Sequence, residues 1–484
     1  MSDPSKQPRH PQEPGVAALS RRRLLGGAVA VGASLAVGSR LVAGAGSGTG
    51  SGAGGLDQWL GLSTPAGAAP SDALLAQITR FADDARQYVP GCAVAAVDHI
   101  AGTAGTYATG TRDLEADEPF LSSTIAIIDS VSKQFTTTML AQAVVGGLGR
   151  NGPLTLDAPI TDYLNPYLDA YGRSLPPLPA AITVGNLADY TSGFLEEPSN
   201  YTDPASAYSL DLLTAWLSDV TTIDGTATSG PYLHAAPGTA YYYSDVAVDL
   251  LGFILADQLI LASSPGMPNY DDLITTFLVG PGVLDMPDTF VTPPAAKESR
   301  IAKGYLYRHG VTPPAADAFE PAPKINRPPE FFGGGGGLRS TADDMVRFLH
   351  ALVAPPALQH LQRAIPLAAE PRFSLSGGRS TGLGWDPIVT ESGVTILLKD
   401  GAGTAGCTSL LGYSPETGRA LFFFTNVDGA TDYLTISEEF KRLLAERSPA
   451  PLDPASTTTT TATDDPSAPG AVATPVSANP RFAG

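Results

Sequence analysis

Ser130-Val131-Ser132-Lys133 is the stretch that decides which fold and which chemistry this chain is expected to have, and it directly follows an apolar run, Ile125 to Ile128. Residues three positions apart on a helix face the same side, with about 5 to 6 Å between their Cβ atoms. An unprotonated Lys133 amine can then take the proton from the Ser130 hydroxyl. The stretch therefore predicts an activated serine nucleophile at the start of a helix.

A simpler interpretation of the same stretch is a serine that only caps a helix N-terminus. Two further segments favour the catalytic interpretation. Tyr243 precedes an apolar helical pattern, and a phenol near a cationic amine can have its pKa lowered enough to relay protons. Lys399 ends an apolar run and is followed by glycines, which let a substrate lie against backbone N–H groups.

Composition limits the class of function. The chain has 484 residues, of which 43% are hydrophobic and 16% charged, so it can bury a large core. Its net charge of -19 argues against a nucleic-acid partner or an anionic membrane surface. The 6 histidines are scattered without the spacing of metal ligands, so we expect no metal ion. The serine chemistry implies no organic cofactor either.

The two ends of the chain differ from the middle. Residues 1–45 contain Arg21-Arg22-Arg23, then a short apolar stretch rich in Gly and Ala, and a small-residue cleavage site. Paired arginines in this place are typical of the twin-arginine export signal, so we expect an exported protein, secreted or in the cell envelope, with no membrane span after processing. Residues 46–70 have the composition of a flexible linker, and the Thr-, Pro- and Ala-rich residues 448–484 that of a disordered tail.

The remaining residues, 71–447, are expected to form one folded unit of the α+β class. Helical spacing of apolar residues predicts a first and a last helix, and short apolar runs predict strands near both ends of the unit. Strands from both ends of the unit around a long helical middle indicate a sheet whose edges come from distant segments, and therefore an α+β fold rather than βαβ units. The expected helices span residues 72–88 and 432–446, and the expected strands 92–97, 106–110, 394–398, 408–413 and 420–426.

The chain has 2 cysteines, Cys92 and Cys407, and each lies at the start of an apolar stretch. An exported protein can join two thiols. We favour two buried free thiols, and their pairing stays open at this point.

The order of the three motifs, Ser-x-x-Lys, then Tyr, then Lys followed by glycines, resembles that of the serine penicillin-recognising enzymes. This superfamily comprises class C β-lactamases, D-alanyl-D-alanine peptidases and related esterases. The resemblance covers nearly the whole folded unit and implies a β-lactamase/transpeptidase-like fold, with a five-stranded antiparallel sheet flanked by helices plus a helical lobe. Supporting segments are Leu154 to Asp157, Tyr190-Thr191-Ser192-Gly193, Gly333 to Gly337 and Gly382-Leu383-Gly384-Trp385.

The resemblance also implies roles for individual residues. Ser130 would be the acylated nucleophile, Lys133 its partner base and Tyr243 the proton relay to the leaving group. Lys399, Gly401 and Ala402 would contact the substrate, together with Asp245. The backbone N–H groups of Ser130 and of a residue near Ala402 would hold the oxyanion.

Three positions depart from the pattern of the superfamily. Asp245 stands where an asparagine is usual; an ionised carboxylate only accepts hydrogen bonds, and it can hold Lys133 in the protonated form. Tyr190 stands where a histidine is usual, which we interpret as a structural change. One extra residue in the third motif leaves either Lys399 or Asp400 at the key position, and a cation is the better contact for an anionic substrate.

We therefore expect an exported serine hydrolase that acts through an acyl-enzyme on small esters or D-amino-acid amides. The first alternative is a β-lactamase or D-alanyl-D-alanine carboxypeptidase, and the second is a non-catalytic protein that binds peptidoglycan peptide. Gly378-Arg379-Ser380-Thr381-Gly382 matches the nucleophile elbow of α/β-hydrolases, but no histidine follows it in the chain, so we do not favour that fold.

Overall fold

The computed structural model describes residues 70–448, apart from 151, 202–207, 227–229, 261–268, 309–310, 312, 314, 324–332, 359, 377–378, 391, 404 and 430–432. The predicted export signal, linker and tail lie outside these residues, except for Pro70 and Ser448 at their inner edges. In the described part, no helix is both long and apolar enough to cross a membrane.

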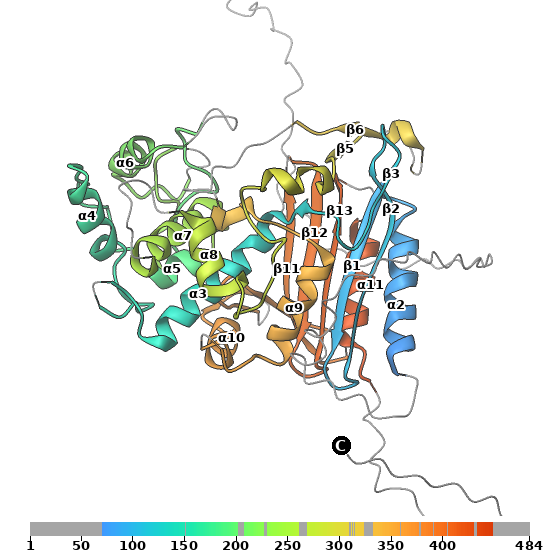
Figure 1. Cartoon of the computed structure of the whole chain (residues 1–484). Coiled ribbons are helices and arrows are strands. Elements are labelled where there is room, and N and C mark those ends of the chain that lie inside the picture. The colour runs from blue at the N-terminus through green and yellow to red at the C-terminus, as the bar shows by residue number, and fades with distance from the viewer. Residues whose placement is uncertain are drawn as a thin grey trace, which may run out of the picture. The chain divides into compact units, whose positions relative to one another are not determined.

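A seven-stranded sheet in the order β10-β11-β12-β13-β1-β2-β3 forms the centre of this part, and its paired strands are antiparallel (Figure 1). β1 pairs with β13, with Cys92 opposite Thr425, so the two ends of the folded unit meet inside the sheet. The predicted α+β fold is confirmed, and β10 and β3 add to the five expected strands at the two edges. The strands are β1 (Gly91–Asp98), β2 (Thr103–Asp113), β3 (Glu118–Pro119), β10 (Asp386–Val389), β11 (Thr395–Gly403), β12 (Cys407–Ser414) and β13 (Arg419–Thr425).

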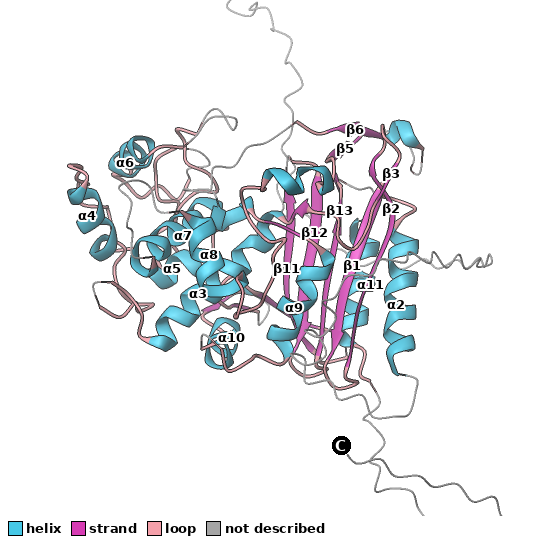
Figure 2. Ribbon diagram, viewed as in Figure 1, coloured by secondary structure: helices cyan, strands magenta, loops and turns pink. Residues whose placement is uncertain are grey.

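Helices cover both faces of the sheet, as the burial of β1 shows. All of β1 is buried. Because side chains alternate across a strand, Val94 points into the layer under α2 (Pro70–Ala85) and α11 (Tyr433–Ala445), whereas Ala93 and Ala95 point into the core on the other side. Figure 2 shows α2 and α11 together on one face of the magenta sheet, with the other helices beyond the opposite face.

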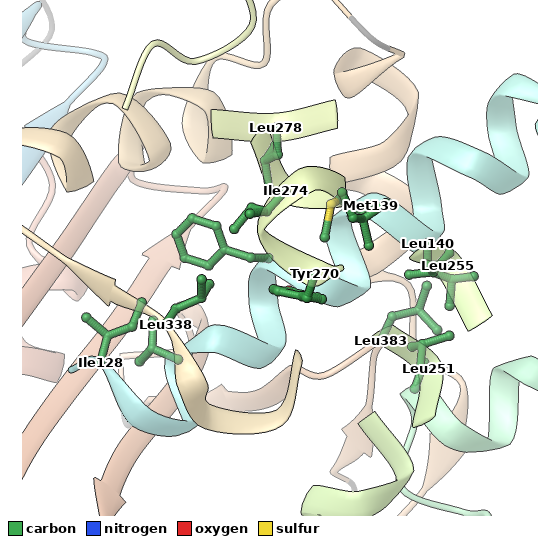
Figure 3. Close-up of a cluster of buried hydrophobic side chains, with 14 of the residues drawn as sticks. Ile128, Met139, Leu140, Leu251, Leu255, Tyr270, Ile274, Leu278, Leu338 and Leu383 are labelled. Carbon is green, nitrogen blue, oxygen red and sulfur yellow. The ribbon is translucent and has the colours of Figure 1, made fainter. Parts of the chain in front are cut away.

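The opposite face carries α3 (Ser132–Gly146), α9 (Ala342–Val353) and α10 (Leu361–Ala369), and beyond them lies a helical lobe. Two helices of this part are buried on nearly every side, polar residues included. These are α3 and α7 (Asp245–Leu259). Figure 3 shows Met139 of α3 packed near Ile274 of α8 (Tyr270–Ile274), in the core that holds the lobe against the sheet.

The other elements are short and connect these layers. The helices of the lobe not yet named are α4 (Thr161–Ala170), α5 (Val184–Ala188) and α6 (Leu210–Asp219). The remaining strands are β4 (Ala126–Ile127), β5 (Tyr305–Tyr307), β6 (Phe319–Pro321), β7 (Arg339–Ser340), β8 (Phe373–Ser374), β9 (Ser380–Thr381) and β14 (Val427–Asp428). The short 3₁₀ and π helices are η2 (Asp129–Val131), η3 (Thr275–Val279), η4 (Ala295–Arg300), η5 (Ala316–Ala318) and η6 (Gly333–Gly337).

The cysteines are both buried and free, which confirms the favoured expectation. Burial raises the pKa of the Cys92 thiol to about 12 and raises the pKa of Cys407 as well. Thiols with raised pKa values carry little thiolate and are poor nucleophiles. We therefore assign both cysteines to the core and not to the chemistry.

Candidate active site

Ser130 lies in η2, a single turn that leads directly into α3. The turn is tight, because Asp129 adopts a φ of 45°, a left-handed conformation that non-glycine residues adopt uncommonly. Two contacts hold the entrance of the turn: the Ile128 N–H donates to the Leu338 carbonyl at 2.9 Å, and the Ser409 hydroxyl donates to the Ile128 carbonyl at 2.7 Å. The strained turn is thus fixed by both the sheet and the segment that precedes β7.

Lys133 lies one turn further along, in α3, with no measurable exposure to solvent. Its Nζ donates to Ser130 Oγ at 3.1 Å, so the contact expected from the three-residue spacing is present. Nζ also donates to Asp245 Oδ1 at 2.5 Å and to the Gly335 carbonyl oxygen. A serine oxygen, a carboxylate and a backbone carbonyl therefore satisfy the amine inside the protein.

Tyr243 reaches the same serine from the helical lobe, because its hydroxyl donates to Ser130 Oγ at 2.6 Å. It lies just before α7, whose N-terminus is capped by Ser244: the hydroxyl of this serine accepts from the Ala247 N–H at 3.1 Å. The Tyr243 ring lies between two amines, with Lys133 Nζ 5.0 Å and Lys399 Nζ 4.9 Å from its centroid. Both lysines of the site therefore lie against the phenol that contacts the serine.

Lys399, and not Asp400, faces this site from β11. The side chain of Lys399 is 2% exposed and that of Asp400 is 48% exposed, with 3.4 Å between Lys399 Nζ and Asp400 Oδ1. The sequence left these two residues as alternatives for the key position. The alternation of side chains along a strand explains the outcome, because neighbouring residues point to opposite faces.

Gly401 brings the backbone of β11 against the nucleophile. A Cβ atom at this position would lie 2.6 Å from the Ile128 carbonyl oxygen and 3.0 Å from the backbone N of Ser130, so a side chain would collide. Ala402 follows on the same strand, opposite Thr408 of β12. The predicted oxyanion site, formed by the Ser130 N–H and by backbone near Ala402, therefore has both of its segments side by side.

The glycine run of η6 passes between α3 and α7, beside the amine of Lys133. A Cβ atom at Gly334 would lie 3.0 Å from the Val248 carbonyl oxygen, and one at Gly335 would lie 2.7 Å from Asp249 Oδ1. Only glycine lets the backbone approach this closely, and the approach places the Gly335 carbonyl on Lys133. The sequence indicated the run as a family segment but did not show this contact.

Burial and the neighbouring charges all shift the pKa of the Lys133 amine. Burial is the largest effect and lowers the pKa of Lys133 below its ordinary value, and the Lys399 ammonium lowers it further. The Asp245 carboxylate acts against both, as the sequence led us to expect. Because the net direction is downward, more of the amine is unprotonated at neutral pH than in an exposed lysine.

Tyr190 supports the ring of Tyr243 from behind. The two ring centroids are 5.1 Å apart with 30° between the ring planes, and the Tyr190 hydroxyl donates to the Gly384 carbonyl at 3.3 Å. Burial raises the pKa of Tyr190, so this phenol stays neutral. Its packing agrees with the interpretation of Tyr190 as a structural replacement for histidine.

Within the described ranges, no three His, Cys, Asp or Glu side chains come together as a possible metal site. The groups that meet around Ser130 are an amine, a phenol and backbone amides. A serine hydroxyl in contact with an amine and a phenol is suited to nucleophilic attack on a carbonyl and to formation of an acyl-enzyme. Such an arrangement is typical of a serine hydrolase.

The sequence model of the Beta-lactamase family matches residues 74–446, and the chain belongs to this family. A β-lactamase of Yersinia enterocolitica is 26% identical over 329 residues, covering 65% of this chain and 71% of the relative. The esterase EstB of Burkholderia gladioli is 27% identical over 358 residues, covering 68% of this chain and 85% of the relative. Family and relatives together identify the protein as a serine hydrolase.

Solved structures show the same fold. A class C β-lactamase superposes with a TM-score of 0.60 at 19% identity, covering 78% of this chain and 99% of that one. A β-lactamase/D-alanine carboxypeptidase from Pseudomonas syringae gives a TM-score of 0.59 at 19% identity, covering 78% of this chain and 100% of that one. The fold that the motif order implied is thereby confirmed.

Proposed function

We propose that the protein hydrolyses small esters or D-amino-acid amides through an acyl-enzyme on Ser130. The observation that carries the proposal is the double contact at Ser130 Oγ, with Tyr243 OH at 2.6 Å and Lys133 Nζ at 3.1 Å. A purely structural serine does not need a buried amine and a phenol on one oxygen. Groups placed to move a proton from a hydroxyl are typical of nucleophilic catalysis.

In the proposed mechanism, Ser130 Oγ attacks the substrate carbonyl carbon as its proton passes to unprotonated Lys133. The Ser130 N–H and backbone near Ala402 bind the oxyanion of the tetrahedral intermediate. Tyr243 gives its hydroxyl proton to the leaving oxygen or nitrogen, and the carbon–leaving-group bond breaks. Lys133 then returns a proton to Tyr243, whose ring lies 5.0 Å from the Lys133 amine.

Deacylation repeats these steps with water as the nucleophile. Water attacks the acyl carbon and passes its proton to Lys133. Ser130 Oγ leaves and takes a proton from Tyr243, which restores the serine hydroxyl. The sequence of bonds made and broken releases one alcohol or amine and one carboxylic acid. The relay requires neither a metal ion nor an organic cofactor.

Acidic residues around the site support the preference for esters and amides over β-lactams, which carry a carboxylate. Asp245 Oδ1 is engaged by Lys133 at 2.5 Å, and as a carboxylate it cannot donate to a substrate carbonyl as an asparagine amide can. Asp400 Oδ1 lies 3.4 Å from Lys399 Nζ and neutralises part of the positive charge that would attract an anion. The name of the relative EstB points in the same direction.

A β-lactamase or D-alanyl-D-alanine carboxypeptidase is the second candidate. The specific observation in its favour is Lys399, whose ammonium lies 4.9 Å from the centroid of the Tyr243 ring and can attract a substrate carboxylate. The printed names of several relatives and structural neighbours also include β-lactamase. Substrate choice therefore depends on how far Asp400 and Asp245 offset this charge.

A comparison of hydrolysis rates tests the proposed function. The full chain is assayed with p-nitrophenyl butyrate, D-alanine p-nitroanilide and nitrocefin, each beside the Ser130→Ala variant. We expect the ester or the D-alanine amide to have a kcat/KM at least about tenfold above that of nitrocefin, which corresponds to about 1.4 kcal/mol of preference in the transition state. Faster turnover of nitrocefin would favour the second candidate. Absence of turnover, with reversible binding of peptidoglycan peptides, would instead identify a binding protein.

A further inference from the structure

We propose that Asp249 is a positioning residue for the reaction, because it holds the Gly335 carbonyl against the Lys133 amine. Its carboxylate is also the second negative charge, after Asp245, that acts on this amine. This inference rests on the proposed function, in which Lys133 exchanges protons with Ser130. Asp249 belongs to α7 and has no exposure to solvent. Its hydrogen bond acts on the lysine through Gly335, and its charge acts on the amine through space.

The connection from Asp249 to the amine has two hydrogen bonds that share one peptide residue. The Gly335 N–H donates to Asp249 Oδ1 at 2.5 Å, and the Gly335 carbonyl accepts from Lys133 Nζ. Hydrogen bonds to a charged group are about twice as strong as neutral ones. The carboxylate therefore fixes the orientation of the residue whose carbonyl receives the lysine.

The local packing leaves the glycine little freedom to turn away. A Cβ atom at Gly335 would lie 2.7 Å from both Asp249 Oδ1 and Asp249 Oδ2, so the carboxylate lies directly against this backbone. The neighbouring glycine is confined as well, because Gly334 approaches the Val248 carbonyl and accepts a hydrogen bond from Thr136 at 2.9 Å through its own carbonyl. Asp249 thus contacts η6 at the point where η6 contacts Lys133.

Asp249 follows Asp245 by four residues on α7, and residues at this spacing share one face of a helix. Both carboxylates therefore face α3 and its lysine. The charged and titratable groups around the Lys133 amine are Asp245 and Asp249 from α7, Lys399 from β11, and Tyr243 from the segment before α7. The two carboxylates raise the pKa of Lys133, whereas burial and Lys399 lower it.

Two substitutions separate the charge of Asp249 from its hydrogen bond. Asp249→Asn keeps an oxygen that can accept the Gly335 N–H but removes the negative charge. Asp249→Ala removes both. A matched control on the same helix is Asp257→Asn, since Asp257 is also buried and pairs with Arg150 at 2.5 Å instead of with the site.

The experiment measures kcat/KM against pH for the full chain with the best substrate of the panel. Unprotonated Lys133 is the active form, so kcat/KM rises with pH through the pKa of the amine. Removing a nearby negative charge favours the unprotonated amine, and we expect Asp249→Asn to move this acidic limb to lower pH by about one unit. We expect Asp249→Ala to move it equally and also to reduce kcat at least about tenfold, through misplacement of the amine.

A second measurement separates this inference from the proposed function. The pKa of Lys133 is followed directly by the ¹³Cε resonance in ¹³C-lysine-labelled protein, with Lys133→Met to assign the signal, so it needs no substrate. A lower pKa in Asp249→Asn and an unchanged one in Asp257→Asn would support the role of Asp249 even if no tested substrate is hydrolysed. Equal pKa values in wild type and Asp249→Asn, or an equal shift in Asp257→Asn, would overturn it.

Discussion

Replacing Ser130 with alanine is expected to lower kcat/KM for ester or amide substrates by about 10⁵-fold, because loss of the nucleophile in a serine hydrolase has an effect of this order. The side chain makes both site contacts, to Tyr243 and to Lys133, through the one oxygen that alanine lacks. Stability should change little, because Ser130 Oγ is not among the contacts that hold η2 in place. The measurement is steady-state hydrolysis together with a denaturation midpoint.

Ser132 provides the matched control for this substitution. It is a buried serine only two positions further, and its hydroxyl accepts from the Leu338 N–H at 3.1 Å instead of contacting the amine. We expect Ser132→Ala to lower stability by about 1 kcal/mol and to keep most of the activity. A Ser130→Ala enzyme that stays active beside an inactive Ser132→Ala enzyme would show that the wrong serine has been assigned.

Lys133→Met is expected to have the second largest effect, in both activity and stability. Methionine removes the base from Ser130 and leaves Asp245 buried without the amine that it contacts at 2.5 Å. We expect kcat/KM to fall by about 10⁴-fold, within the range that general-base catalysis contributes. Breaking a buried ion pair on one side typically costs about 3 to 5 kcal/mol of folding free energy, which a urea denaturation curve measures.

The double variant Lys133→Met with Asp245→Asn separates these two effects. Because it removes both charges of the pair, it should recover much of the lost stability. It should not recover activity, since Ser130 still has no amine beside it. Recovered activity in the double variant would mean that Lys133 acts only as a structural partner of Asp245.

Much of the fold could be predicted from the sequence, because apolar runs and helical periodicity are strong at both ends of the folded unit. The five expected strands are all present, and α11 (Tyr433–Ala445) lies within the predicted 432–446. α2 was predicted at 72–88 but occupies Pro70–Ala85. A proline fits the first turn of a helix, where its missing N–H leaves no intrahelical bond unmade.

The two edge strands, β3 and β10, could not be predicted from the local sequence pattern. β3 has only two residues, too few for a period-two pattern. β10 contains Pro387, and a proline within a run lowers the expectation of a strand, although it is tolerated at an edge. β10 is an edge strand of the sheet, and this position accommodates the proline.

The contact between Ser130 and Lys133 could be expected from the sequence, because both residues belong to one short segment. Ser130 and Lys133 lie one turn apart, so local geometry alone brought them together. Tyr243 and Lys399 were placed by the resemblance of motif order, because no local pattern relates residues so distant in the chain. In the structure, Tyr243 OH lies 2.6 Å from Ser130 Oγ, and Lys399 Nζ lies 4.9 Å from the centroid of the Tyr243 ring.

Asp249 and Gly335 were missed because their role arises from the packing of α7 against η6. Two signals in the sequence indicated it in part. One is the four-residue spacing from Asp245 to Asp249 in a mostly apolar helix, and the other is a run of five glycines. Neither signal shows that the carboxylate and the glycine backbone meet at the amine, because this requires the three-dimensional arrangement of segments far apart in the chain.

The most direct test of the central claim is to detect the acyl group on the protein. The full chain is treated with a slowly deacylated ester or penicillin probe, quenched in acid, and digested for mass spectrometry. We expect one adduct on the peptide that contains Ser130, and none in the Ser130→Ala variant. Substrate turnover without this adduct, or an adduct on another side chain, would contradict the assignment of Ser130 as the nucleophile.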